Sequence, residues 1–222
     1  MIKLCLLILQ VTLLLSVSIH SHALSNKEGK NTLNTLSDLS PNRTQQEASL
    51  YVARSLSLSH YRKQNIDKAL SEKVYNNYLN TLDRSRLYFL SSDIEEFEIY
   101  RFRLDSALKT GQLDPAFKMY NRIQTRIVER LNQQISLVKD KLKTLNFSKD
   151  EFILKDRSET HWAASKQELD DIWRRRTKSA VLSLKLDGKS LEEISETLTK
   201  RYENQLKRTL QIRSEDAFSA YM

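Results

Sequence analysis

Apolar residues recur at every third or fourth position along most of the chain from residue 44 onward. This spacing is that of one face of an α-helix, and it predicts an all-α fold. We expect an irregular bundle of about six to seven helices, forming one domain over residues 44–222. The expected helices cover residues 44–59, 67–82, 92–110, 114–144, 165–187 and 190–210, and a last one begins at Ser214.

Local capping signals mark several of these helix starts. Capping boxes, in which a serine and a glutamate three residues later satisfy each other's backbone N–H groups, are expected at residues 92–95, 165–168 and 190–193. Asp114-Pro115 is typical of a first helical turn. The helix that begins there would span about 45 Å at roughly 1.5 Å per residue. We expect this long helix to be the spine on which the others pack.

The first 23 residues have the pattern of a cleaved signal peptide. Lys3 supplies the positive start, the apolar run Leu4 to Ile19 follows, and Ser21-His22-Ala23 offers small residues for cleavage. The run is shorter than the roughly twenty residues of a membrane span, so an uncleaved anchor is the alternative. After cleavage no integral membrane span is expected. Residues 24–43 are polar and predict a disordered lead-in.

Cysteine usage indicates the compartment. Cys5 is the single cysteine of the chain and lies inside the leader, so the mature protein would have no thiol for a disulfide, a metal site or a nucleophile. Export without disulfides is more typical of the bacterial periplasm than of small animal secreted domains. The sequence therefore predicts a periplasmic protein.

The charge balance is basic, with 36 Lys and Arg against 28 Asp and Glu. The densest basic run is Arg174-Arg175-Arg176 with Lys178. A nucleic-acid interface would need a basic stripe with stacking aromatics or a known motif, and neither is evident. We expect no nucleic-acid partner, and we expect the run to cover a solvated face or to contact an acidic partner.

Candidate catalytic residues are few. The sequence has no G-x-S-x-G, no glycine-rich phosphate loop and no H-E-x-x-H, and its 3 glycines leave no turn suited to presenting a serine nucleophile. Outside the leader the histidines are His60 and His161, which we expect at helix ends or on the surface. Two acidic clusters stand at expected helix starts, where carboxylates suit the helix dipole. Their members are Asp93, Glu95, Glu96, Glu98, Glu192, Glu193 and Glu196. The sequence predicts no catalytic residue, no metal ligand and no cofactor.

Three stretches carry a resemblance to a known family. They are SHYRK at residues 59–63, YLNTLDRSRLYFLSSDIEEF at 78–97 and ELDDIWRRRTKSAVLSLKLDGKSLEEISETLTKRYENQLKR at 168–208. In order and spacing they resemble the N-terminal helical domain of the bacterial tail-specific proteases, the periplasmic carboxyl-terminal processing peptidases. The resemblance covers residues 47–222, and its motifs are structural rather than catalytic.

The resemblance implies a family whose longer members process proteins from their C-termini. In that family a segment like SEDAFSAYM, residues 214–222, leads on to a PDZ domain and a protease domain with a serine–lysine dyad. No residue of this sequence matches that dyad, so we expect a non-catalytic scaffold or interaction domain, truncated before the PDZ and protease portions. Its partners would be an adaptor, a substrate or those missing portions. The alternatives are a free-standing periplasmic protein that binds adaptors or regulates the protease, and a basic module that binds a membrane surface or nucleic acid.

Overall fold

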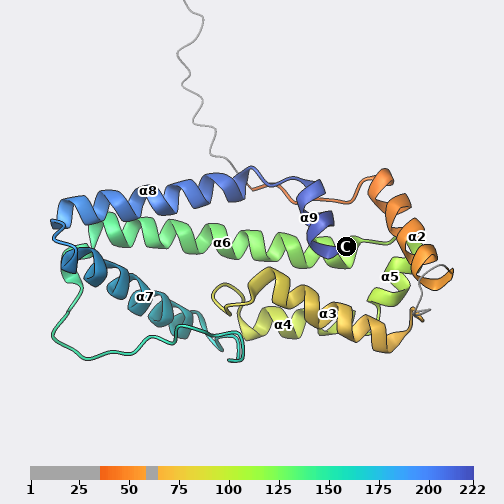
Figure 1. Cartoon of the computed structure of the whole chain (residues 1–222), viewed down its shortest axis with the longest axis horizontal. Coiled ribbons are helices and arrows are strands. Elements are labelled where there is room, and N and C mark those ends of the chain that lie inside the picture. The colour runs from red at the N-terminus through yellow and green to blue at the C-terminus, as the bar shows by residue number, and fades with distance from the viewer. Residues whose placement is uncertain (1–35, 59–64) are drawn as a thin grey trace, which may run out of the picture. The chain divides into compact units, whose positions relative to one another are not determined.

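The computed structural model describes residues 36–58 and 65–222. The predicted signal peptide, Cys5, most of the lead-in and His60 lie outside the described residues. Within them the chain forms eight α-helices and two short 3₁₀ helices, which confirms the all-α prediction (Figure 1). The α-helices are α2 (Arg43–Leu58), α3 (Lys68–Asp83), α4 (Ser91–Phe97), α5 (Leu104–Thr110), α6 (Asp114–Asp140), α7 (Lys166–Leu186), α8 (Leu191–Leu210) and α9 (Ser214–Tyr221). The 3₁₀ helices are η1 (Glu98–Tyr100) and η2 (Leu142–Thr144).

Helix α6 is the spine that the apolar pattern predicts. It has 27 residues, about 40 Å at roughly 1.5 Å per residue, and α8 packs along it (Figure 1). It ends at Asp140, and the residues predicted to be its last turn form η2 instead. Side chains of α6 enter two apolar clusters, one toward each of its ends.

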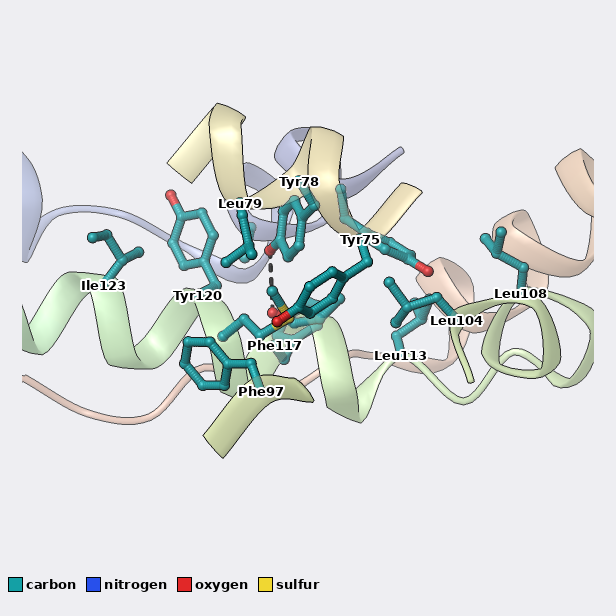
Figure 2. Packing of buried hydrophobic residues seen from close by; sticks show 14 of the residues in the cluster. Tyr75, Tyr78, Leu79, Phe97, Leu104, Leu108, Leu113, Phe117, Tyr120 and Ile123 are labelled. Atoms are coloured by element: carbon teal, nitrogen blue, oxygen red, sulfur yellow. Dashed lines mark hydrogen bonds between the residues drawn. The ribbon is translucent and has the colours of Figure 1, made fainter. Parts of the chain in front are cut away.

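The first cluster joins α2, α3, α4, α5, α6 and α9. Figure 2 shows Tyr75, Tyr78 and Leu79 of α3 meeting Phe117 and Tyr120 of α6. The Tyr78 hydroxyl donates to the carbonyl of Ala116 at 3.1 Å, so its polar end is satisfied inside the core. Helix α9 enters this cluster through Ala217 and Tyr221, and the Tyr221 ring meets that of Tyr78 edge to face at 5.2 Å.

The second cluster joins α6, α7 and α8. Its most buried members are Leu131, Val138, Ala163, Val181, Ile194 and Leu198. Trp173 of α7 lies among them and donates its indole N–H to the carbonyl of Leu87 at 2.7 Å. Tyr88 and Ile127 pack against both clusters, so the two cores are continuous across α6.

The prediction of a single helix over residues 92–110 is wrong, because the chain forms α4, η1 and α5 there. The cause is a hydroxyl from another helix. Ser71 of α3 donates to the carbonyl of Arg101 at 2.8 Å and accepts from the N–H of Leu104 at 2.8 Å. These two bonds replace helical ones, so the helix turns at this point.

The predicted capping boxes have different outcomes. The box of Ser190 with Glu193 is confirmed, with bonds of 3.2 and 2.8 Å between each side chain and the other's backbone N–H. The box at residues 92–95 does not form. There Asp93 accepts from the N–H of Leu90 at 2.9 Å, so the cap of α4 is Leu90, two residues before the expected Ser92.

Ser165 caps α7 as predicted, accepting from the N–H of Glu168 at 3.2 Å. The glutamate reaches one residue beyond the box geometry and accepts from the N–H of Ala164 at 2.8 Å. At α9 the cap falls one residue before the expected Ser214. There Asp216 accepts from the N–H of Arg213 at 2.9 Å.

Residues 36–42, the end of the predicted lead-in, have no regular secondary structure but are held on α6. The side-chain amide of Asn121 accepts from the N–H of Leu39 at 3.0 Å and donates to its carbonyl at 2.9 Å. The Leu39 side chain packs against the first cluster. Residues 36–42 are therefore fixed against the helical domain ahead of α2.

Candidate functional site

The turn between α3 and α4 is organised by one buried carboxylate. Asp83 accepts from the backbone N–H groups of Leu87, Tyr88 and Phe89 at 2.9, 3.1 and 3.0 Å. Trp162, from the loop before α7, adds its indole N–H at 3.2 Å. Burial raises the pKa of Asp83, and these hydrogen bonds oppose that rise. The carboxylate therefore fixes the turn instead of facing a substrate.

Arg86 completes this turn with an unusual backbone. Its φ is +51°, in the left-handed region that side chains other than glycine seldom adopt. Its guanidinium donates to the carbonyl of Asp83 at 3.2 Å and stacks over the ring of Trp162 at 3.9 Å. The strain of the backbone is compensated by a hydrogen bond and a cation–π contact.

The loop before α7 is attached to the start of α4 by backbone bonds. Leu90 and Ala163 form an isolated parallel bridge, and the N–H of Ser91 donates to the carbonyl of Ala163 at 2.9 Å. The hydroxyl of Ser91 donates to the carbonyl of Trp162 at 3.0 Å. Segments about seventy residues apart in the sequence are thereby locked together.

A second buried carboxylate, Asp93, joins α4 to α6. Arg122 donates to it at 2.6 Å, and Arg126 donates through two nitrogens, each at 2.9 Å. Burial alone would raise the pKa of Asp93, but the hydrogen bonds from Arg126, the Leu90 N–H and Arg122 lower it overall. This acidic residue, which the sequence places at a helix start, is both a cap and an interhelical ion pair.

The basic run on α7 contacts carboxylates of its own chain. Arg174 forms ion pairs with Glu151 and with Asp171, and Lys178 lies 2.5 Å from Glu151. Arg175 pairs with Asp171 at 2.8 Å and donates to the carbonyl of Phe152 at 3.1 Å. These ion pairs and hydrogen bonds hold the loop that precedes α7 against the helix, a role that the sequence did not predict.

That loop leaves an apolar segment on the surface. Phe152 is 85% exposed and Leu154 is 53% exposed, next to Ile153. Beneath them is a hollow of about 60 Å³, lined by the segment 152–154, by Ile172 and by Arg157, Arg175 and Arg176. We call this surface, the segment and its hollow together, the Phe152 surface.

The other residues considered for catalysis that the structure describes have structural roles or lie on the surface. His161 is exposed beside Trp162. Glu98 pairs with Arg101, Glu193 caps α8, and Glu196 pairs with Lys200 at 2.5 Å. Hydrogen bonds from those partners lower the pKa of each of the three carboxyl groups.

Two further findings concern the described residues alone. In residues 36–58 and 65–222 no three His, Cys, Asp or Glu side chains are grouped closely enough to hold a metal ion. None of the helices in that part of the chain is both long and apolar enough to cross a membrane.

Three residues organise the loop before α7 without being recognisable from the pattern of the sequence, namely Asp83, Glu151 and Trp162. The available signal was the stretch DRSR, an acid at the end of a helical pattern followed by a polar turn. That signal marks a turn but does not identify the donors that come from far along the chain.

The fold and these contacts are those of an all-α domain in which buried charged groups join helices and loops to one another. Residues 52–222 match the family described as "Tail specific protease N-terminal domain". The chain is also 34% identical over 190 residues to the tail-specific protease of Haemophilus influenzae. The chain therefore belongs to the tail-specific protease family, as the resemblance of residues 47–222 implied. The aligned stretch is 84% of this chain and 27% of that relative, so the chain spans about a quarter of the relative's length.

Proposed function

We propose that this chain is a non-catalytic scaffold and interaction domain that acts with the peptidase machinery of a periplasmic tail-specific protease. The observation that carries the proposal is the family match over residues 52–222, set beside the roles of the polar groups that those residues bury. Asp83 and Asp93 are satisfied by backbone, tryptophan and arginine donors of the same chain. Groups held in this way position helices and loops, which is what a scaffold requires.

The partners in this proposal are proteins: an adaptor, a substrate, or the PDZ and protease portions of the family. The serine–lysine dyad would be supplied by that protease portion. Export through a cleavable signal peptide over residues 1–23 would bring the chain to the same compartment. The exposed apolar residues of the Phe152 surface offer a place for protein contact.

The intact mass of the native product tests the proposal most directly. An antibody against α6 would recover the product from a periplasmic extract for mass spectrometry. A species much heavier than 26.0 kDa would place this domain inside a longer enzyme, and one slightly lighter would be the chain after leader removal, acting by binding. Recovery from the cytoplasm alone would contradict the periplasmic assignment.

A peptidase assay tests the non-catalytic part of the proposal. The purified 222-residue chain is incubated with an unfolded protein labelled at its C-terminus, and we expect no release of the label. Hydrolysis by the chain alone, surviving extensive purification, would overturn the scaffold role.

A free-standing periplasmic regulator that binds an adaptor is the second candidate. The packing of α9 favours it, because Ala217 and Tyr221 are buried in the first cluster and the described residues cover that core with their own helices. A stable, monodisperse 222-residue form would support this candidate, whereas precipitation of that form would count against it.

A further inference from the structure

The segment Glu151 to Lys155 has no regular secondary structure and is held against α7, with Phe152, Ile153 and Leu154 as its apolar centre. Its start is fixed by the ion pairs of Glu151 with Arg174 and Lys178, and by the bond from Arg175 to the carbonyl of Phe152. Because these contacts fix the backbone, Phe152 and Leu154 are presented to solvent in a defined arrangement. A surface that is ordered before binding loses less conformational entropy when a partner arrives.

The backbone of this segment is available for pairing. Within residues 36–58 and 65–222, the N–H groups of Phe152, Ile153 and Leu154 donate no hydrogen bond. The carbonyl of Phe152 accepts one bond, from Arg175. A segment outside regular secondary structure whose N–H groups donate no bond within the described residues can pair with an extended peptide from another protein, in the way that a sheet edge accepts an additional strand.

The hollow beside the segment is cationic. Three arginines line it, Arg157, Arg175 and Arg176, and no carboxylate does. Arg175 is neutralised by Asp171 at 2.8 Å, but Arg157 and Arg176 have no ion pair within 4.0 Å in the described part of the chain. Burial lowers the pKa of Arg157, and the nearby Arg175 and Arg176 lower it further, while Glu168 and Asp83 oppose these effects. An incoming carboxylate would relieve this concentration of positive charge.

We propose that the Phe152 surface is a docking site for an extended, acidic peptide segment of a partner protein. The free backbone groups select an extended ligand, the arginines select carboxylates, and the exposed side chains of Phe152 and Leu154 add apolar contact. This inference rests on the proposed function and specifies the class of protein segment that the interaction domain would bind.

Fluorescence anisotropy with the full 222-residue chain tests the site. The probe is a fluorescein-labelled decapeptide of alternating valine and glutamate, and a decapeptide of alternating valine and lysine is the charge control. We expect binding of the acidic peptide and none of the basic one. Replacing two central valines of the acidic peptide with proline removes two N–H donors, and we expect at least tenfold weaker binding.

Variants of the chain locate the site. Phe152→Ser and Arg176→Glu should each weaken binding of the acidic peptide at least tenfold. Two matched controls lie away from the Phe152 surface: Leu186→Ser removes a side chain that is 80% exposed, and Lys189→Glu reverses an exposed charge. Both should bind as the unchanged chain does. Circular dichroism and thermal melting show whether each variant is folded, and Phe152→Ser removes so exposed a side chain that it should melt normally.

Several results would overturn the inference. One is equal affinity for the acidic and basic peptides, and another is affinity for the acidic peptide that Phe152→Ser and Arg176→Glu leave unchanged. Dimerisation in analytical ultracentrifugation that Phe152→Ser abolishes would identify a second copy of the chain as the occupant. Binding to phosphatidylglycerol vesicles without binding to the peptide would identify a lipid surface.

Failure of the proposed function gives a different result. A chain with its own peptidase activity that still binds the acidic peptide at the Phe152 surface would disprove the scaffold role and leave the docking site standing. A chain that lacks peptidase activity and ignores the peptide would disprove the docking site alone.

Discussion

Trp162 donates its indole N–H to the carboxylate of Asp83, which lies 79 residues earlier in the chain, at 3.2 Å. This bond makes the α3–α4 turn and the loop before α7 a single structural unit. The same carboxylate accepts three backbone N–H groups, so a single side chain satisfies four donors. Losing it would leave those donors without a partner in an environment where water has little access.

Asp83→Ala should therefore destabilise the protein strongly. Each unsatisfied buried donor costs about 1–3 kcal/mol, and partial rearrangement of the turn reduces the sum, so we expect a loss of about 3–5 kcal/mol. Urea denaturation followed by circular dichroism measures this loss. Asp150→Ala removes an exposed carboxylate without a hydrogen bond in the described residues and should change stability by less than about 0.5 kcal/mol. Equal effects of the two substitutions would contradict the role assigned to Asp83.

The pairing of Asp93 with Arg122 and Arg126 predicts that removing both arginines reverses the pH dependence of the contribution of Asp93 to stability. In the unchanged chain the pKa of Asp93 lies below its ordinary value of 3.8, so its contribution to stability is full above that value and is lost as the pH falls through the lower, folded-state pKa. In the double variant with Arg122→Met and Arg126→Met, the Asp93 carboxyl group stays buried without its two arginine partners. Its pKa should then rise above the ordinary value, and the ionised form would be the destabilised one.

We expect that double variant to lose about 2–4 kcal/mol at pH 7, a figure reduced from the usual cost of breaking a buried pair because both arginines are partly exposed. The deficit should shrink as the pH falls toward 4. Urea denaturation at several pH values measures it. Lys118→Met on α6 is the control, since Lys118 is exposed and has no ion pair in the described residues. A deficit that is constant with pH would disprove this account.

Gly111 and Gly188 form a natural comparison. Both have positive φ, +70° and +82°, so an alanine at either position costs about 1 kcal/mol in backbone strain. At Gly188 an added Cβ meets nothing within 4 Å, whereas at Gly111 it would lie 3.0 Å from the carbonyl oxygen of Gln46 in α2. Gly111→Ala should therefore cost about 1 kcal/mol more than Gly188→Ala and should weaken the hydrogen-exchange protection of α2. Identical melting temperatures for the two variants would argue against close packing of α2 on residue 111.

Tyr221 allows the apolar and polar parts of the α9 contact to be separated. Its ring is buried against Tyr78, but its hydroxyl has no hydrogen-bond partner within the described residues. Burial raises the pKa of Tyr221 above that of a phenol in water. Tyr221→Phe should be neutral or stabilise by up to about 1 kcal/mol, and Tyr221→Ala should cost about 3–4 kcal/mol through the cavity that it leaves. Thermal unfolding of the two variants checks this, and a large loss in Tyr221→Phe would reveal an additional partner of the hydroxyl.

The features that the sequence predicted are those with local causes. The apolar stripe of α6 and the box of Ser190 with Glu193 depend on residues a few positions apart, and both are found in the structure. The division of the predicted third helix depends on Ser71, about thirty residues away in α3. The ion pair between Arg174 and Glu151 likewise joins residues 23 positions apart. Spacing along the sequence shows none of these distant donors, which is why residues 92–110 were predicted as one helix and why the contacts of the basic run with its own chain were not predicted.

The ion pairs of Glu151 with Arg174 and Lys178 should be measurable through the titration of Glu151. Hydrogen bonds from Arg174 and Lys178 lower the pKa of Glu151 to about 2 from an ordinary 4.5. Its stabilising contribution is therefore present above pH 4.5 and is lost only as the pH falls through about 2. Carbon-13 NMR of the carboxyl group should show a titration midpoint near the lower value, and Arg174→Met should move the midpoint toward the ordinary value. A midpoint unchanged by that substitution would show that Arg174 does not hold the carboxylate in solution.

Glu151→Gln should release the apolar segment that Glu151 anchors. Chymotrypsin binds extended, locally mobile segments, so cleavage after Phe152 at pH 7.5 should become several-fold faster once the two ion pairs are lost. Glu95→Gln is the matched control, because Glu95 is exposed and forms no ion pair in the described residues. Cleavage should remain slow in that control. If Glu151→Gln is cleaved at the rate of the unchanged chain, the segment is held by other contacts, and the order attributed to the Phe152 surface would need a different physical cause.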